Sequence, residues 1–149
     1  MKKEFENFKL TIELVPSTCF YKNVRSEISR DKWNKIRYSV YKRARFRCEI
    51  CGGKGENHPV ECHEIWDFDS THRIQKLIDF IALCPDCHRV KHIGLAEIKG
   101  EQHLAMKQLK KVNGINDIIA HKYLAHCVYI WRKRSEHHWT LNISYLDNF

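Results

Sequence analysis

Apolar and polar residues alternate along two segments near the ends of the chain, residues 8–15 and 139–145. A period of two is typical of a half-buried strand, so each segment predicts one strand. We expect these two strands to pair and so to tie the ends of the chain together. Residues 17–29 show no such pattern and predict an irregular connection.

The middle of the chain predicts extended structure around a turn. Residues 60–66 are expected to form a strand, and the polar residues 67–71 that follow predict a turn. Residues 74–83 are strongly apolar, so they predict either a second strand or a buried connector.

Four segments predict helices: residues 32–46, 84–92, 101–112 and 116–134. In the first and the last, apolar side chains recur at three- and four-residue spacing and form one apolar face. Gly94 is expected to end the second helix. Together with the strands, these helices predict a mixed α+β fold.

The length of 149 residues favours a single domain that covers residues 1–149. Its expected parts are an N-terminal strand and basic helix (1–47), a central core (48–92), and C-terminal helices with a strand (93–149). Apolar residues make up 43% and charged residues 30%, which is ordinary for a globular protein. A domain of this size folds without much excess stability, so loss of a metal that cross-links it would matter.

The chain is basic, with a formal net charge of +8 and a pI near 9.2. This charge favours a polyanionic partner, and DNA is the partner we expect. The alternative is a basic surface that is merely solvated. The candidate nucleic-acid contacts lie on the helix over 32–46 and beside the central core: Lys35, Lys42, Arg43, Arg45, Arg47, Arg89 and Lys91.

Residues 1–6 are too acidic and polar for a signal peptide. No apolar run approaches the roughly 20 residues that a membrane span needs. We therefore expect a cytoplasmic protein without membrane contact, present as a monomer or a homodimer.

Seven cysteines are present, and four of them form two C-x-x-C pairs: Cys48, Cys51, Cys84 and Cys87. An odd number with this spacing favours metal binding in a reducing compartment over a disulfide framework. Four thiolates are the ligand set that zinc prefers in closed structural sites. Four unrelated buried cysteines, or a redox pair, are the alternatives. The other three cysteines are expected to be buried small residues: Cys19, Cys62 and Cys127.

Histidines follow the second C-x-x-C pair directly. His88 and His92 are four residues apart on a predicted helix, so their side chains share one face. Such a pair can hold one metal ion and leave positions open to a substrate. His63, on a predicted strand, is a natural third ligand. The alternative is three histidines that are solvated or packed in the interior.

The cysteine and histidine motifs follow one another in the order found in a known protein family. Cys-x-x-Cys at 48–51, Val-Glu-Cys-His-Glu-Ile at 60–65, and Leu-Cys-Pro-Asp-Cys-His-x-x-x-His at 83–92 resemble the HNH endonuclease family in its four-cysteine form. More loosely, the flanks at 14–16, 33 and 139–144 resemble those of small bacterial and phage members. The resemblance implies a ββα-metal core with a structural zinc knuckle. It also implies cleavage of DNA phosphodiester bonds with one divalent ion, such as Mg²⁺ or Mn²⁺.

Carried over to this chain, the resemblance makes the four paired cysteines zinc ligands and makes His88 and His92 ligands of the catalytic ion. Two registers remain for the first strand. Either His63 is the third ligand and Glu64 the general base, or Cys62 is the ligand and His63 the base. We prefer the first register, because a thiolate suits Mg²⁺ or Mn²⁺ poorly. Asp79 falls where the family has the residue that orients the base.

A different class of function stays open at this point. The same residues could form a zinc-stabilised DNA-binding or protein-interaction module without catalysis. Chelator-sensitive cutting of a plasmid would separate the enzyme from the module.

Overall fold

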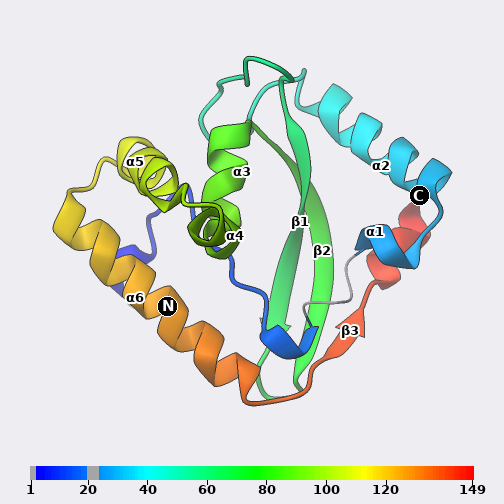
Figure 1. Cartoon of the computed structure of the whole chain (residues 1–149). Helices are drawn as coiled ribbons and strands as arrows, with labels where there is room; N and C mark the ends of the chain where they lie inside the picture. The colour runs from blue at the N-terminus through cyan, green and yellow to red at the C-terminus, as the bar shows by residue number, and fades with distance from the viewer. Residues whose placement is uncertain (1–2, 20–23) are drawn as a thin grey trace.

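A long antiparallel hairpin lies at the centre of the computed structural model, which describes residues 3–19 and 24–149 (Figure 1). Its strands are β1 (Glu61–Asp69) and β2 (Ile74–Leu83). They pair from Glu61↔Leu83 to Asp69↔Ile74, with a bulge between Ile65 and Trp66. The strand predicted over 60–66 is confirmed, and residues 74–83 form a strand rather than a buried connector. The first extends to Asp69, into the segment expected to be a turn.

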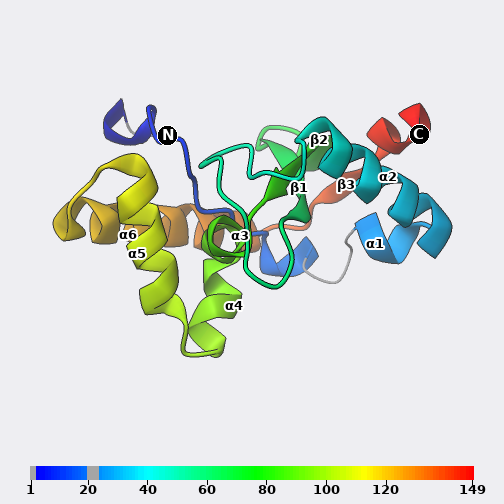
Figure 2. The same cartoon turned by 90° about the horizontal axis from the view of Figure 1, so that it is seen from above.

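Helices cover both faces of this hairpin, which gives a mixed α+β fold (Figures 1 and 2). On one side lie α1 (Val24–Glu27), α2 (Arg30–Arg43) and the C-terminal 3₁₀ helix η3 (Ser144–Asn148). On the other lie α3 (Pro85–Lys91), α4 (Ile93–Ile98), α5 (Gln102–Asn113) and α6 (Asp117–Ser135).

Buried apolar side chains form two clusters, one on each face of the hairpin. The alternation of side chains along β2 explains this arrangement. Phe80 and Ala82 belong to the apolar cluster that includes Ile36 and Val40 of α2. Leu83, one residue further along the strand, belongs to the cluster under the helices α3 to α6. Successive side chains of a strand point to opposite faces, so one strand serves both clusters.

The helix α2 is shorter than predicted at its C-terminal end. It begins after Ser29, whose Oγ accepts a hydrogen bond from the Lys32 N–H at 3.2 Å. It ends at Arg43 rather than at residue 46. Arg45 and Phe46 take left-handed conformations, with φ of 53° and 56°, which a right-handed helix excludes. This turn directs the chain toward Cys48.

The segment before α2 also differs from the irregular connection that the sequence predicts over 17–29. A 3₁₀ helix η2 (Ser17–Cys19) and the single turn α1 form there. Residues 20–23 of that segment lie outside the described residues.

The expected stop at Gly94 is wrong. The helix α3 ends because His92 has φ −101° and ψ 42°, and α4 begins at the next residue with Gly94 inside it. The later helices follow the prediction closely. Gly114, with φ 63°, ends α5, and the Asn116 side chain caps α6 by accepting from the Ile119 N–H at 2.9 Å.

The predicted N-terminal strand is wrong, although its alternation is real. A short 3₁₀ helix η1 (Lys3–Phe5) precedes an extended segment that joins no sheet. Side chains of α5 and α6 bind its backbone instead. Asn113 Oδ1 accepts from the Leu10 N–H at 3.1 Å, and Asn113 Nδ2 donates to the Leu10 carbonyl at 2.8 Å. Trp131 Nε1 donates to the Val15 carbonyl at 2.9 Å.

The predicted pairing of the two ends of the chain is wrong for the same reason. The C-terminal strand exists as β3 (Thr140–Asn142), but it pairs with β2 in parallel, from Ile74↔Thr140 to Lys76↔Asn142. Side chains of α5 and α6 bind several backbone groups of the N-terminal segment, and the Glu13 N–H donates to the Lys91 carbonyl, so the segment lies along the helices and not beside β3. Within the described part of the chain, no helix is both long and apolar enough to cross a membrane.

Candidate metal centre

Four thiols converge where the loop before β1 meets the start of α3. Cys48, Cys51, Cys84 and Cys87 each place a sulfur within 4.8 Å of the other three. Cys51 Sγ and Cys84 Sγ are 3.6 Å apart. Four sulfurs around a tetrahedral zinc ion, with Zn–S of about 2.3 Å, lie about 3.8 Å from one another. The cluster therefore has the size and the ligand type that a zinc ion needs.

The first C-x-x-C pair is shaped by its glycines. Gly52 has φ 74°, a conformation that residues with a side chain rarely adopt. The Gly53 N–H donates to Cys51 Sγ at 3.4 Å, and the Cys51 N–H lies 3.5 Å from Cys48 Sγ. A Cβ atom on Gly53 would lie only 3.3 Å from Cys51 Sγ. Small residues thus let backbone amides approach the sulfurs.

The second C-x-x-C pair is fixed by a helix. Cys84 is the N-cap of α3 and Pro85 is in its first turn, so Cys87 lies one turn along the helix. Gln108 of α5 donates to Cys87 Sγ at 3.3 Å. The helix start therefore sets the position of both sulfurs.

The charges in the cluster favour a cation. A hydrogen bond from the Cys87 thiol lowers the pKa of Cys48 to about 4, whereas burial raises the pKa of Cys84 to about 11. The thiolate of Cys48 is thus stabilised by a hydrogen bond from a neighbouring thiol. A metal ion can replace the protons of these thiols. Burial also raises the pKa of Cys62 to about 12 and that of Cys127 to about 11, as expected for cysteines outside the cluster.

Three imidazoles form a second group beside the first. His63 of β1, His88 of α3 and His92 after α3 each offer a ring nitrogen within 4.8 Å of the other two. The ring centroids are 5.3, 4.9 and 4.6 Å apart for the pairs 63–88, 63–92 and 88–92. His63 is only 3% exposed. The structure thus brings together the three histidines that the sequence singled out.

Carboxylates hold the outer nitrogens of two of these rings. His63 Nε2 donates to Glu13 Oε2 at 2.9 Å, and His88 Nδ1 donates to Glu61 Oε2 at 2.5 Å. The other nitrogen of His63, Nδ1, is buried without a hydrogen-bond partner among the described residues. A buried polar atom without a partner is costly, and a bound cation would satisfy it. Metal-binding histidines are typically held by a carboxylate in this way.

The pKa values fit a cation site as well. Burial would raise the pKa of Glu13, but the hydrogen bond from His63 and the ammonium of Lys91 lower it to about 2. A hydrogen bond from His88, with a smaller one from His58, lowers the pKa of Glu61 to about 2. Burial and the two neighbouring imidazoles lower the pKa of His92 to about 3. His92 is therefore neutral at pH 7, with a lone pair available to a metal.

Sequence reasoning missed both carboxylates. Glu61 precedes His63 by two residues on the same strand, so the two share a face, and this signal was available. Glu13 lies 50 residues from His63, and only the path of the N-terminal segment brings them together.

The residues assigned to the general base need correction. Glu64 follows His63 directly in β1, so its side chain points to the opposite face. Cys62 shares that opposite face and packs against the cluster that contains α2. The charge of Glu64 helps to raise the pKa of Cys62, which places these two together. Neither Glu64 nor Cys62 is brought to the histidines.

The orienting role expected of Asp79 is also corrected. Its Oδ1 accepts from the Tyr145 hydroxyl at 3.0 Å and from the Phe80 N–H at 2.7 Å, and it lies 3.4 Å from Arg43 Nη1. Asp79 thus links β2 to α2 and η3 and has no contact with His63.

Four of the predicted nucleic-acid contacts have other partners. Lys91 is 5% exposed, and its ammonium binds Glu13 and Thr11 at 2.8 Å each, so its assignment is corrected. Arg43 and Arg89 each pair with two carboxylates, and Arg47 donates to a backbone carbonyl. The remaining three are exposed and form no ion pair within the described part of the chain: Lys35, Lys42 and Arg45.

The two ligand groups differ in what they leave open. Four sulfurs complete the coordination of a tetrahedral ion and exclude other ligands. Three imidazole nitrogens leave at least one position for water or a substrate oxygen.

Comparisons of the chain with models of known protein families, with curated proteins and with solved structures gave no match.

Proposed function

We propose that this protein is a metal-dependent endonuclease of the HNH kind, which hydrolyses phosphodiester bonds in DNA. One observation carries the proposal: the nitrogens of His63, His88 and His92 lie within 4.8 Å of one another, beside four thiols that are equally close. The sequence order of these ligands, with the first histidine on a hairpin strand and the last two at the following helix, supports a ββα-metal core.

The cysteines would hold a structural zinc ion. Cys84 and Cys87 belong to the start of α3, and the same helix carries His88 one residue later. Zinc bound there fixes the start of α3 and so fixes the imidazole against His63. The structural site would thus serve the second site through geometry, without taking part in the reaction.

The three histidines would hold one divalent ion, such as Mg²⁺ or Mn²⁺. A cation at that position supplies Lewis-acid stabilisation of the negative charge that develops on phosphate oxygens. Glu13 and Glu61 hold the imidazoles in one tautomer and one orientation. Lys35, Lys42 and Arg45, which are exposed, would contact neighbouring phosphates.

His58 is the group that we assign to take the proton from the attacking water. Glu61 links it to the histidine cluster, because Glu61 Oε1 accepts from His58 Nε2 at 2.9 Å while Glu61 Oε2 accepts from His88. This hydrogen bond leaves the Nδ1 lone pair of His58 to accept the proton. The His58 side chain is 51% exposed, so water reaches it. Its position supports a base role that Glu64 cannot fill from the other face.

Plasmid cleavage tests the proposal. Zinc-loaded protein is incubated with supercoiled plasmid or with circular single-stranded DNA, with Mg²⁺, with Mn²⁺ or with neither. We expect cutting that requires the added ion. His88→Ala should lower the rate at least about 100-fold, because it removes a ligand of the ion that stabilises the transition state.

His103→Ala is the matched control, since His103 is exposed on α5 and belongs to neither ligand group. Zinc content and circular dichroism show whether each variant keeps its fold. Equal cutting by the His88 and His103 variants would overturn the proposal. DNA binding without cutting under every ion would favour the non-catalytic zinc module instead.

A further inference from the structure

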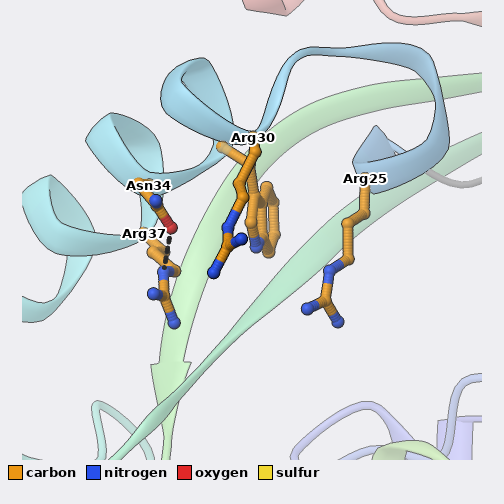
Figure 3. Close-up of a pocket in the computed structure, with 5 residues that line it drawn as sticks. Arg25, Arg30, Asn34 and Arg37 are labelled. Carbon is orange, nitrogen blue, oxygen red and sulfur yellow. Dashed lines mark hydrogen bonds between the residues drawn. The ribbon is translucent and has the colours of Figure 1, made fainter.

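Three arginine side chains line a pocket that the proposed cleavage site does not use (Figure 3). Arg25 comes from α1, and Arg30 and Arg37 come from α2. Their guanidinium groups extend to the same side of these helices, in front of the hairpin strands. The pocket has a volume of about 280 Å³, and Trp33 and Asn34 complete its lining.

None of the described residues balances the positive charge of this pocket. Among residues 3–19 and 24–149, no carboxylate lies within ion-pair distance of the guanidinium groups of Arg25, Arg30 or Arg37. Arg37 Nε donates to the neutral Asn34 Oδ1, at 2.9 Å. Arg43 and Arg89, by contrast, are each paired twice. Guanidinium groups gathered without acids are suited to a phosphate.

A second groove, of about 380 Å³, adjoins this pocket and shares Arg37 with it. Aromatic rings line the groove in a row. The ring of Tyr38 lies 5.9 Å from that of Tyr41, which lies 6.4 Å from that of Phe46. Tyr38 is 50% exposed and Phe46 40%, so both present apolar surface to the solvent. Arg37 lies 4.9 Å above the Tyr38 ring, which joins the charged part to the aromatic part.

The groove extends from these rings to the residues before and at the start of β1. His58 and Glu61 line it there, together with Pro59 and Val60. Glu61 also accepts the hydrogen bond from His88. The two pockets therefore form a path from the three arginines, past the row of aromatic rings, to His58 and to Glu61, the hydrogen-bond partner of His88.

We propose that this path binds a single strand of DNA, with phosphate groups in the arginine pocket and unstacked bases against Tyr38 and Phe46. A charged groove with aromatic rings is the arrangement that binds single strands, because every exposed base has a face that can stack. In a duplex the base faces are covered by their neighbours and cannot reach the rings. The substrate class is thus DNA with an unpaired arm, such as a flap or a gap. That substrate claim depends on the proposed nuclease activity; the binding claim does not.

Fluorescence anisotropy of a labelled 12-nucleotide oligothymidine tests the binding. The measurement uses zinc-loaded protein without Mg²⁺ or Mn²⁺, so the strand is not cut and the fold is kept. Tyr38→Ala should weaken binding about 5- to 100-fold, the usual effect of losing one stacked base, and Tyr38→Phe should not. Arg30→Ala should lower the slope of log affinity against log salt by about 0.7.

Matched controls lie on α6, across the hairpin from α2. Tyr129 is 61% exposed and Arg132 is also exposed, so Tyr129→Ala and Arg132→Ala remove the same groups elsewhere. We expect both to bind as the wild type does. Equal weakening by Tyr38→Ala and Tyr129→Ala, equal affinity for a 12-base-pair duplex, or equal affinity for polyglutamate would each overturn the inference.

The two proposals fail separately. A protein that binds oligothymidine through Tyr38 but never cuts DNA keeps the inference and loses the nuclease. A protein that cuts a plasmid but treats single strands and duplexes alike keeps the nuclease and loses the inference.

Discussion

Replacing Glu13 with glutamine should separate the stability of the fold from the geometry of the histidine cluster. The glutamine side chain has nearly the shape of the glutamate that it replaces, but it carries no charge. Lys91 would then be a buried ammonium without an ionic partner, since its present bonds are to Glu13 and Thr11 at 2.8 Å each. His63 would lose the ionised acceptor that fixes its ring.

Two arguments give the size of the effect on stability. Breaking a buried ion pair by removing one partner costs about 3–5 kcal/mol. The pKa of Glu13 gives a similar value: it falls from 4.5 to about 2, and at 1.36 kcal/mol per pKa unit this corresponds to about 3 kcal/mol. The Glu13 side chain is 25% exposed, so we expect the lower end of the range.

Urea unfolding of zinc-loaded protein measures this change. Glu13→Gln should lower the free energy of unfolding by about 3 kcal/mol. The double variant with Lys91→Met should recover most of that loss, because no buried charge remains. Both variants should bind Mn²⁺ at the second site about 10- to 100-fold more weakly, because His63 lacks its carboxylate in both. Glu136→Gln, at an exposed ion pair, should cost less than about 1 kcal/mol.

The difference in free energy of unfolding between the wild type and Glu13→Gln should depend on pH. A carboxyl group whose pKa is lowered by folding stabilises the fold fully above its unfolded pKa, and this stabilisation is lost as the pH falls. The advantage of the wild type over Glu13→Gln should therefore be constant above about pH 5 and shrink between about pH 5 and pH 3. An advantage that stays constant down to pH 3, or a double variant as unstable as the single one, would refute this account of Glu13.

Three further changes test the fold. Cys84→Ser should lower zinc content and abolish cooperative unfolding, as measured by atomic absorption and urea titration, because it removes one of four ligands in the cysteine cluster. Asn113→Ala should cost about 2–3 kcal/mol in thermal unfolding, because it breaks two bonds to the Leu10 backbone. Gly55→Ala should cost about 1–3 kcal/mol in the same assay, because a Cβ atom there would clash with the His58 backbone carbonyl and lie 2.7 Å from Pro85 Cδ.

Each of these changes has a control in the same chain. Cys127→Ser alters a half-buried thiol outside the cluster and should leave zinc content unchanged. Gly94→Ala should cost nothing, since its Cβ would meet Leu14 Cδ2 at 3.6 Å, an ordinary contact. Asn148→Ala removes an exposed amide and should shift unfolding by less than about 0.5 kcal/mol. A control as damaging as its partner would show that the assigned contact is not the cause.

The features that the sequence predicted well are those with a local signal. The C-x-x-C spacing and the bounds of the helices over 101–112 and 116–134 depend on residues only a few positions away. The spacing of His88 and His92 is of the same kind, since one turn of helix sets both. For these residues the backbone geometry follows from short-range sterics and hydrogen bonds, so the sequence alone is sufficient to predict it.

The features that the sequence did not predict depend on distant partners. Residues 8–15 alternate as a strand does, yet Asn113 binds their backbone from more than 100 positions away. The alternation indicates only that one face of the segment is buried. It does not predict which groups form hydrogen bonds with the backbone N–H and C=O groups. The arginine pocket is similar, because Arg25 and Arg37 meet only through the turn between α1 and α2. The assignment of Glu64 as the base rests on its position next to His63. Adjacent residues of a strand point to opposite faces, however, so Glu64 cannot share the site of His63.

The path of the N-terminal segment also sets when the second site can be completed. Glu13 is held in place by a segment whose backbone binds side chains from α5 and α6, the last of them Trp131. A chain emerging from the ribosome therefore carries its four paired cysteines and the cluster histidines before it has the helices that bring Glu13 to His63. Contacts between such distant residues form late in folding. The four thiols can thus come together before residues 113–131 of the chain have emerged, whereas Glu13 reaches His63 only after them.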